Sequence, residues 1–235
     1  MATYAFSDLH GHMKAWEKIK EITKSEDTLY CLGDCGDRGP QPWDTLKAVL
    51  TDRRVVYLKG NHEDMLIKAV REVLNEDGWG CHDQRLLASN GGAGTLEGIM
   101  SEDNPAMWMA HLALLPCCTT YTNTQGQKVF MCHAGCNIWA DEPEKIPKDK
   151  ELIWDRLHYF NTNGHLMADN VVIVHGHTPI AHLAEEIGIE EPDEWVALEY
   201  CDGKKYCIDQ GTVFSGHATL LNLDTFESID INLND

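Results

Sequence analysis

The stretch "YCLGDCGDRGP", Tyr30–Pro40, decides how this chain is interpreted. A short apolar run ends there, and Asp34 and Asp37 follow three residues apart, with Arg38 beside the second and glycines around both. Glycine lets a loop fold back closely, and polar side chains that a scaffold holds in a loop often carry function. The stretch therefore predicts a strand that ends in a functional loop.

The same pattern occurs at four other places along the chain. "TYAF" runs into "SDLHGH", "VVYL" into "KGNHED", "KVFM" into "CHAG" and "NVVIV" into "HGHTP". After the first of these, Met13, Trp16, Ile19 and Ile22 recur at a spacing typical of a helix. Strands that alternate with helices indicate α/β layers, in which the loops beyond the carboxyl ends of strands gather at one crevice.

The rest of the chain fits one α/β domain. Residues from about 75 to 115 look mostly helical, and the segment from Lys204 onward reads as consecutive strands, which indicates mixed sheets. A length of 235 residues with 43% hydrophobic residues is enough to bury one sizeable core. We expect a single domain over residues 1–235, with mixed sheets flanked by helices.

Charge and composition exclude several classes of partner. The formal net charge of −19 argues against nucleic acid as a ligand, because such binding depends on Lys and Arg neutralising phosphates. No stretch approaches the roughly 18 apolar residues that a membrane-spanning helix needs, so no membrane partner is expected. The nine cysteines form no disulfide-like framework, which favours reduced thiols in the cytoplasm.

The five loops supply carboxylates, imidazoles and an amide, a set of ligands suited to Mn²⁺, Fe or Zn²⁺. Asp8 and His10 lie two residues apart in an extended stretch and could bind one ion together. A second ion would take three side chains from later loops: Asn61, His133 and His177. Asp34 is the expected bridge, since two cations about 3.5–4 Å apart repel each other unless an anion lies between them.

The motifs "DLHG", "GDCGDRG", "GNHE", "HAG" and "GHT", in this order, resemble the signature of the phosphoprotein phosphatase family within the calcineurin-like metallophosphoesterases. The blocks "LLASNGGAGT", "ELIWDR" and "YCIDQGTVFSGH" are similar to compact bacterial and phage Ser/Thr protein phosphatases. The resemblance implies two packed mixed sheets flanked by helices, with a dimetal site at the strand ends. The chain departs from the pattern at Ser7, where glycine is usual, and at Cys35 and Gly36, where apolar residues are commoner.

Carried onto this sequence, the resemblance implies a role for each site residue. Asp34 would be shared by two divalent metals, with Mn²⁺ expected first and Fe or Zn²⁺ as alternatives. His62 would be the general acid, held by Asp37. Of the two histidines in "HGH", the "GHT" match selects His177 as a ligand and leaves His175 to a supporting position. The implied ligands are Asp8, His10 and Asp34 for one metal and Asp34, Asn61, His133 and His177 for the other, and the implied phosphate contacts are Arg38, Asn61 and Arg156.

The predicted activity is metal-dependent hydrolysis of phosphoserine and phosphothreonine in proteins, by in-line attack of a hydroxide that both metals share. Phosphotyrosine and small phosphoesters are further substrates of the same chemistry. The first alternative is a symmetrical dinucleoside polyphosphate hydrolase, a branch that tends to lack an aspartate matching Asp37 and to have "GNHD" where this chain has Glu63. A nuclease-like enzyme is disfavoured by the negative charge and by Arg38, and a non-catalytic binding module by the complete set of ligands.

Overall fold

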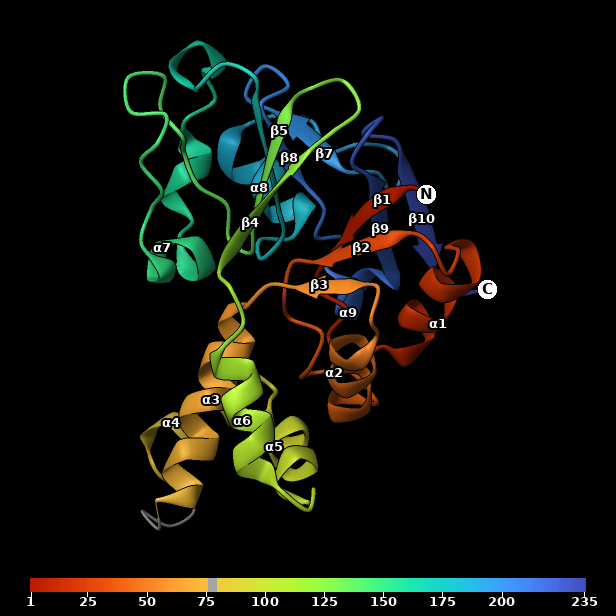
Figure 1. Cartoon of the computed structure of the whole chain (residues 1–235), viewed down its shortest axis with the longest axis vertical. Coiled ribbons are helices and arrows are strands. Elements are labelled where there is room, and N and C mark those ends of the chain that lie inside the picture. The colour runs from red at the N-terminus through yellow and green to blue at the C-terminus, as the bar shows by residue number, and fades with distance from the viewer. Residues whose placement is uncertain (76–79) are drawn as a thin grey trace.

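Two five-stranded β-sheets form the centre of the computed structural model, which describes residues 1–75 and 80–235 (Figure 1). The first sheet contains β1 (Thr3–Phe6), β2 (Thr28–Cys31), β3 (Val55–Tyr57), β9 (His217–Asn222) and β10 (Ser228–Asn232), in the order β10-β9-β1-β2-β3. The second contains β4 (Cys118–Thr122), β5 (Lys128–Cys132), β6 (Val171–His175), β7 (Leu198–Tyr200) and β8 (Lys205–Cys207), in the order β4-β5-β6-β8-β7.

Both sheets are mixed, as predicted. In the first, β1, β2 and β3 are parallel neighbours, whereas β9 and β10 add to β1 in antiparallel fashion. In the second, β5, β6 and β8 are parallel, and β4 and β7 form the antiparallel edges. Parallel neighbours end at the same edge of a sheet, so the loops that follow them emerge together.

Helices cover the outer faces of both sheets (Figure 1). The first half of the chain contributes α1 (Met13–Ile22), α2 (Pro42–Thr51), α3 (Asn61–Leu74), α4 (His82–Ser89), α5 (Ala93–Met100) and α6 (Pro105–Ala113). The second half of the chain adds α7 (Asp149–Trp154), α8 (Ile180–Ile187) and α9 (Thr212–Ser215), with short 3₁₀ turns at Leu157–Phe160 and Gly164–Leu166. Figure 1 shows α3 to α6 lying together on one side, beyond the strand ends.

The predicted helices are confirmed where the structure describes the chain, and α1 shows why. Ala15, Trp16 and Ile19 are its buried positions, at the spacing that places side chains on one face of a helix. The prediction for the C-terminal segment was partly wrong, because α9 separates β8 from β9 and these two strands belong to different sheets.

Alternation along the strands divides the interior into layers. Val129 and Met131 of β5 lie in the core between the two sheets, together with Ala5 of β1. Their neighbours point the other way: Phe6 packs in the cluster beneath the first group of helices, and Phe130 in the cluster beneath α7 and α8. Because successive side chains of a strand point to opposite faces, each sheet is covered on both sides.

Within the described residues, no helix has both the length and the apolar character needed to cross a bilayer.

Candidate active site

The six predicted metal ligands come from loops that follow five different strands, and all six side chains are buried. Asp8 and His10 follow β1, Asp34 follows β2, and the remaining three follow β3, β5 and β6. Contacts between loops of the two sheets join them: the amide oxygen of Asn61 lies 2.8 Å from His133 Nε2 and 2.9 Å from His177 Nδ1.

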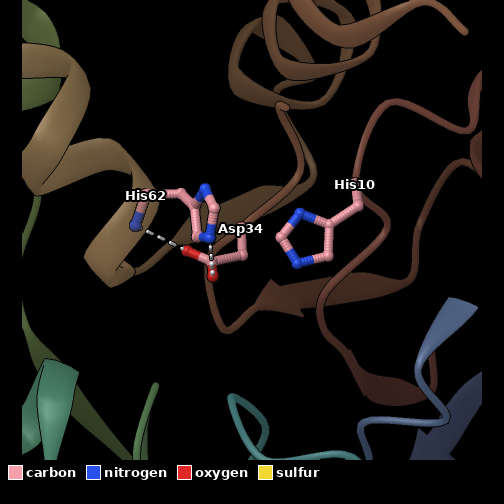
Figure 2. Close-up of side chains that lie close together, drawn as sticks. All are labelled: His10, Asp34 and His62. Atoms are coloured by element: carbon pink, nitrogen blue, oxygen red, sulfur yellow. Dashed lines mark hydrogen bonds and ion pairs between the residues drawn. The ribbon is translucent and has the colours of Figure 1, made fainter. Parts of the chain in front are cut away.

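Asp34 lies at the centre of the cluster. Its Oδ2 is 3.3 Å from His133 Nε2 and 3.9 Å from His62 Nε2, and its Oδ1 accepts a hydrogen bond of 3.1 Å from the backbone N–H of His62. Candidate donor atoms of His10, Asp34 and His62 lie within 4.8 Å of one another, as do those of Asp34, His133 and His177. Figure 2 shows the His10 and His62 rings on two sides of the shared carboxylate.

The outer hydrogen bonds of two histidines determine which nitrogen faces the cluster. His133 Nδ1 donates to the Leu32 carbonyl at 2.7 Å, and His10 Nδ1 donates to the Gly36 carbonyl at 3.1 Å. A ring nitrogen that donates to a carbonyl leaves the lone pair on the opposite nitrogen, which is the arrangement found in histidines that bind metals. Both Nε2 atoms therefore face the interior of the site, where each can bind either a proton or a cation.

Histidine nitrogens and carboxylate oxygens lie close together in the site. Their negative charge and lone pairs favour a bound positive charge. His177 Nδ1 lies 3.2 Å from His133 Nε2, and His177 Nε2 is buried without a hydrogen-bond partner among the described residues. Burial by itself would lower the pKa of His133, but the negative charge of Asp34 outweighs it and raises that pKa to about 10. Nitrogen and oxygen donors without thiolate fit Mn²⁺, Fe or Zn²⁺, so the residues present fit the predicted cations.

Arg38 places its own positive charge beside His10 and His62. Its two terminal nitrogens lie 2.8 Å from His10 Nε2 and 2.8 Å from His62 Nε2. An arginine always donates, so both ring nitrogens accept in this arrangement. The Arg38 side chain is exposed, which places a guanidinium fork at the entrance of the site, where phosphate oxygens could meet it.

Asp8 lies beside the tightest group rather than in it. Its Oδ1 is 4.0 Å from His10 Nε2, while its Oδ2 accepts hydrogen bonds from the Ser7 hydroxyl and, at 3.0 Å, from the backbone N–H of His177. The structure thus brings Asp8 next to His10, as expected, but the group of donor atoms around His10 and Asp34 includes His62 rather than Asp8. Ser7, the departure from the family pattern, uses its hydroxyl to support the Asp8 carboxylate.

Asp37 and His62 form a close pair. Asp37 Oδ2 lies 2.5 Å from His62 Nδ1, and both side chains are buried. Burial lowers the pKa of His62, yet the carboxylates of Asp34 and Asp37 outweigh this effect and raise it above the usual histidine value. A histidine held in this way can keep a proton for transfer.

Thr95 of α5 supports this pair and was not identified from the sequence. Its hydroxyl accepts a 2.9 Å hydrogen bond from the Asp37 backbone N–H and donates to Asp37 Oδ1. The "NGGAG" segment lies nearby as the turn between α4 and α5, where the Gly91 carbonyl accepts from the Arg38 backbone at 2.9 Å.

We expect Thr95→Val to destabilise the fold by about 1–3 kcal/mol, because the buried Asp37 N–H loses its acceptor while the volume stays nearly constant. Urea denaturation measures this free energy. Thr95→Ser, which retains the hydroxyl, should recover most of the hydrogen bonding, and a Val variant as stable as the wild type would contradict the assigned role.

The backbone of the site is held in unusual conformations. Positive φ angles occur at six candidate residues, Asp8, His10, Asp34, Asp37, Arg38 and His177. Such angles are uncommon outside glycine and tend to occur at functional sites. Close packing also demands glycine at two positions: a Cβ at Gly60 would lie 2.0 Å from Asp34 Oδ1, and one at Gly176 would lie 2.2 Å from Asp8 Oδ2.

Two further buried carboxyl groups belong to the surroundings of the site. Glu63 Oε2 accepts from the backbone N–H groups of Asp34 (3.0 Å) and Gly60 (2.8 Å), and Oε1 accepts from the Tyr57 hydroxyl (2.8 Å), so Glu63 ties the loop after β2 to the end of β3 and the start of α3. Burial, followed by the charge of Asp8, raises the pKa of Asp209 well above its usual value. The sequence did offer a signal for Asp209, because it follows β8 at a sixth strand end.

The remaining candidates lie at the margin. Arg156 is exposed, and its Nε donates to the Thr178 hydroxyl at 3.3 Å, one residue beyond His177. His175 points away from the metal cluster: its Nε2 lies 2.8 Å from the Tyr200 hydroxyl. The choice of His177 over His175 therefore agrees with the geometry.

Comparison with known proteins identifies the family. The family model for calcineurin-like phosphoesterases matches residues 1–218. A symmetrical bis(5'-nucleosyl)-tetraphosphatase from Pseudomonas syringae pv. syringae is 24% identical over 275 residues, covering 99% of this chain and 92% of that protein. Four further bacterial proteins that match carry the same name.

Two solved structures show the same fold. A diadenosine tetraphosphatase-like protein superposes with a TM-score of 0.60 at 15% identity, covering 97% of this chain and 91% of that one. A protein serine/threonine phosphatase from Saccharomyces cerevisiae gives a TM-score of 0.57 at 13% identity, with coverage of 96% and 73%. The family match spans most of the sequence, including the second sheet and the parallel strands of the first, and the chain therefore belongs to the calcineurin-like phosphoesterase family.

Proposed function

We propose that this protein is a metal-dependent phosphohydrolase and that its first substrate class is the symmetrical dinucleoside polyphosphates. The chemistry is supported by one observation above the others, the two groups of donor atoms that share Asp34. The substrate class is supported by the curated relatives, all five of which are named symmetrical bis(5'-nucleosyl)-tetraphosphatases. This ranking of the two candidate activities reverses the one predicted from the motifs, in which Asp37 and Glu63 favoured a protein phosphatase.

The site residues would have three roles: to bind cations, to bind phosphate and to transfer a proton. Asp8, His10 and Asp34 would hold one cation, and Asn61, His133 and His177, with Asp34, the other. Two divalent cations, when bound, lower the pKa of a bound water and neutralise charge on the phosphoryl group. The Arg38 fork, between the Nε2 atoms of His10 and His62, is placed to bind phosphate oxygens, and Arg156 offers a second guanidinium. When phosphate oxygens replace His62 Nε2 as the partner of Arg38, that nitrogen would be free to carry a proton and to give it to the leaving oxygen.

A protein phosphatase remains the second candidate, because one observation favours it. A serine or threonine alkoxide is strongly basic and must be protonated as it leaves, whereas a nucleoside diphosphate leaves as a stable anion. The 2.5 Å contact between Asp37 and His62 provides a positioned acid, which an ester substrate needs more than an anhydride does. The two candidates therefore differ in how strongly they require this pair.

A comparison of kcat/KM between substrates distinguishes the two candidate functions. With Mn²⁺ present, we expect a higher kcat/KM for diadenosine tetraphosphate than for a phosphoserine peptide, with ADP as the only nucleotide product. A peptide value that exceeds the dinucleotide value would restore the order drawn from the motifs. Failure to hydrolyse diadenosine tetraphosphate, the peptide or para-nitrophenyl phosphate would leave the non-catalytic binding module.

A further inference from the structure

A cavity of about 340 Å³ lies beside the candidate active site, between the start of α3 and α7. Its walls include Lys59, Asp64, Lys68, Asp149, Lys150 and Trp154. Two links connect it to the metal cluster. Lys59 directly precedes Gly60 and Asn61, and the Trp154 ring lies edge-on to the His177 ring with centroids 6.4 Å apart.

The charge of this cavity differs in sign from that of the chain. Three lysines and two aspartates line it, whereas the whole sequence has a formal charge of −19. One aspartate is already neutralised, because Lys68 Nζ lies 2.7 Å from Asp64 Oδ2. Lys59 Nζ donates to the Ala113 carbonyl at 3.0 Å, which uses one of its three hydrogens. Lys59, Lys150 and Asp149 remain, so the wall keeps one net positive charge that can attract an anion.

The cavity also has an apolar wall suited to a planar group. Trp154 is half-buried and packs against both outer hydrophobic clusters, so its ring position is well supported. Indole rings stack with nucleobases, and lysines bind phosphates as point charges. A ligand that combines an aromatic base with phosphates would complement both parts of the wall.

We propose that this cavity binds one nucleoside diphosphate half of a dinucleoside polyphosphate, while the scissile phosphate lies at the metal cluster. This inference rests on the proposed function. Cleavage of a symmetrical tetraphosphate at its centre leaves a nucleoside diphosphate on each side of the cut. One half must therefore extend from the metal cluster. The cavity is close enough to receive it, because Trp154 of the cavity wall lies next to the His177 ring, with ring centroids 6.4 Å apart. Lys59 and Lys150 would face the phosphates, and Trp154 the base.

Charge reversal at Lys150 tests the proposal. Lys150→Glu should lower kcat/KM for diadenosine tetraphosphate about tenfold and weaken inhibition by ADP to a similar degree, because an attraction becomes a repulsion. Hydrolysis of para-nitrophenyl phosphate, which is too small to reach the cavity, should stay within about twofold. The matched control is Lys148→Glu, two residues earlier, exposed, and not part of the cavity wall.

The possible outcomes separate the two hypotheses. If the wild type hydrolyses diadenosine tetraphosphate and Lys150→Glu behaves like Lys148→Glu on it and on ADP inhibition, the cavity proposal is overturned and the proposed function stands. If the wild type hydrolyses only phosphoesters, the proposed function fails, and the cavity proposal fails with it. A selective loss in Lys150→Glu alone supports both.

Discussion

Asp34→Asn should lower kcat/KM on every phosphate substrate by at least about 10³-fold and leave the protein with no more than one bound metal ion. The neutral amide keeps the shape of the side chain but removes the charge that screens two neighbouring cations. Asp34 is the only residue present in both donor groups found in the described part of the chain, so its loss affects both cations. Elemental analysis of the purified variant, together with para-nitrophenyl phosphate hydrolysis, measures the two effects.

A matched substitution separates this effect from a general loss of charge. Asp169 has a side chain that is 99% exposed, so Asp169→Asn should retain both metal content and activity. Circular dichroism of Asp34→Asn checks that the variant is folded. A folded Asp34→Asn protein with two metals and normal turnover would remove the basis of the proposed chemistry.

The second large effect is expected at His62 and depends on the leaving group. His62→Asn should slow hydrolysis of a phosphoserine peptide by about 10²–10⁴-fold, which is the usual contribution of a general acid. Para-nitrophenyl phosphate and diadenosine tetraphosphate should lose less, because their leaving groups depart as stable anions. The measurement is kcat/KM on the three substrates with equal metal loading. An equal loss on all three would show that His62 acts by positioning alone.

Asp37 offers an independent check on the same pair. The charge of Asp37, with that of Asp34, raises the pKa of His62 against the effect of burial. Asp37→Asn removes one of these charges and should lower that pKa. His62 would then lose its proton at lower pH, so the alkaline limb of the phosphopeptide pH–rate profile should move down in pH. A limb that does not move would mean that the proton donor is another group.

Local patterns were sufficient to predict most of the elements and the loops that carry the site. Short apolar runs identified β1, β2, β3, β5 and β6, and Asp8, Asp34 and His133 follow soon after such runs. This works because strand and helix periodicity are properties of neighbouring residues. It failed for α9, where a four-residue helix is too short to show a periodic pattern.

Contacts between distant segments could not be predicted in this way. Thr95 supports Asp37 from 58 positions along the chain, and no local pattern marks the side chain of an ordinary helix as a hydrogen-bond partner. The presence of His62, rather than Asp8, in the donor group with His10 and Asp34 likewise follows from how the loops pack.

The sequence by itself determined the α/β class, the strands that precede the site loops and the candidate ligands that these loops carry, because motifs and periodicity are properties of consecutive residues. Only the tertiary structure decided that loops of two different sheets meet around Asp34, that Thr95 and Glu63 hold this meeting in place, and that a lysine-lined cavity adjoins it. The physical reason is that side chains from separate loops share one site only after the cores between and outside the sheets have packed.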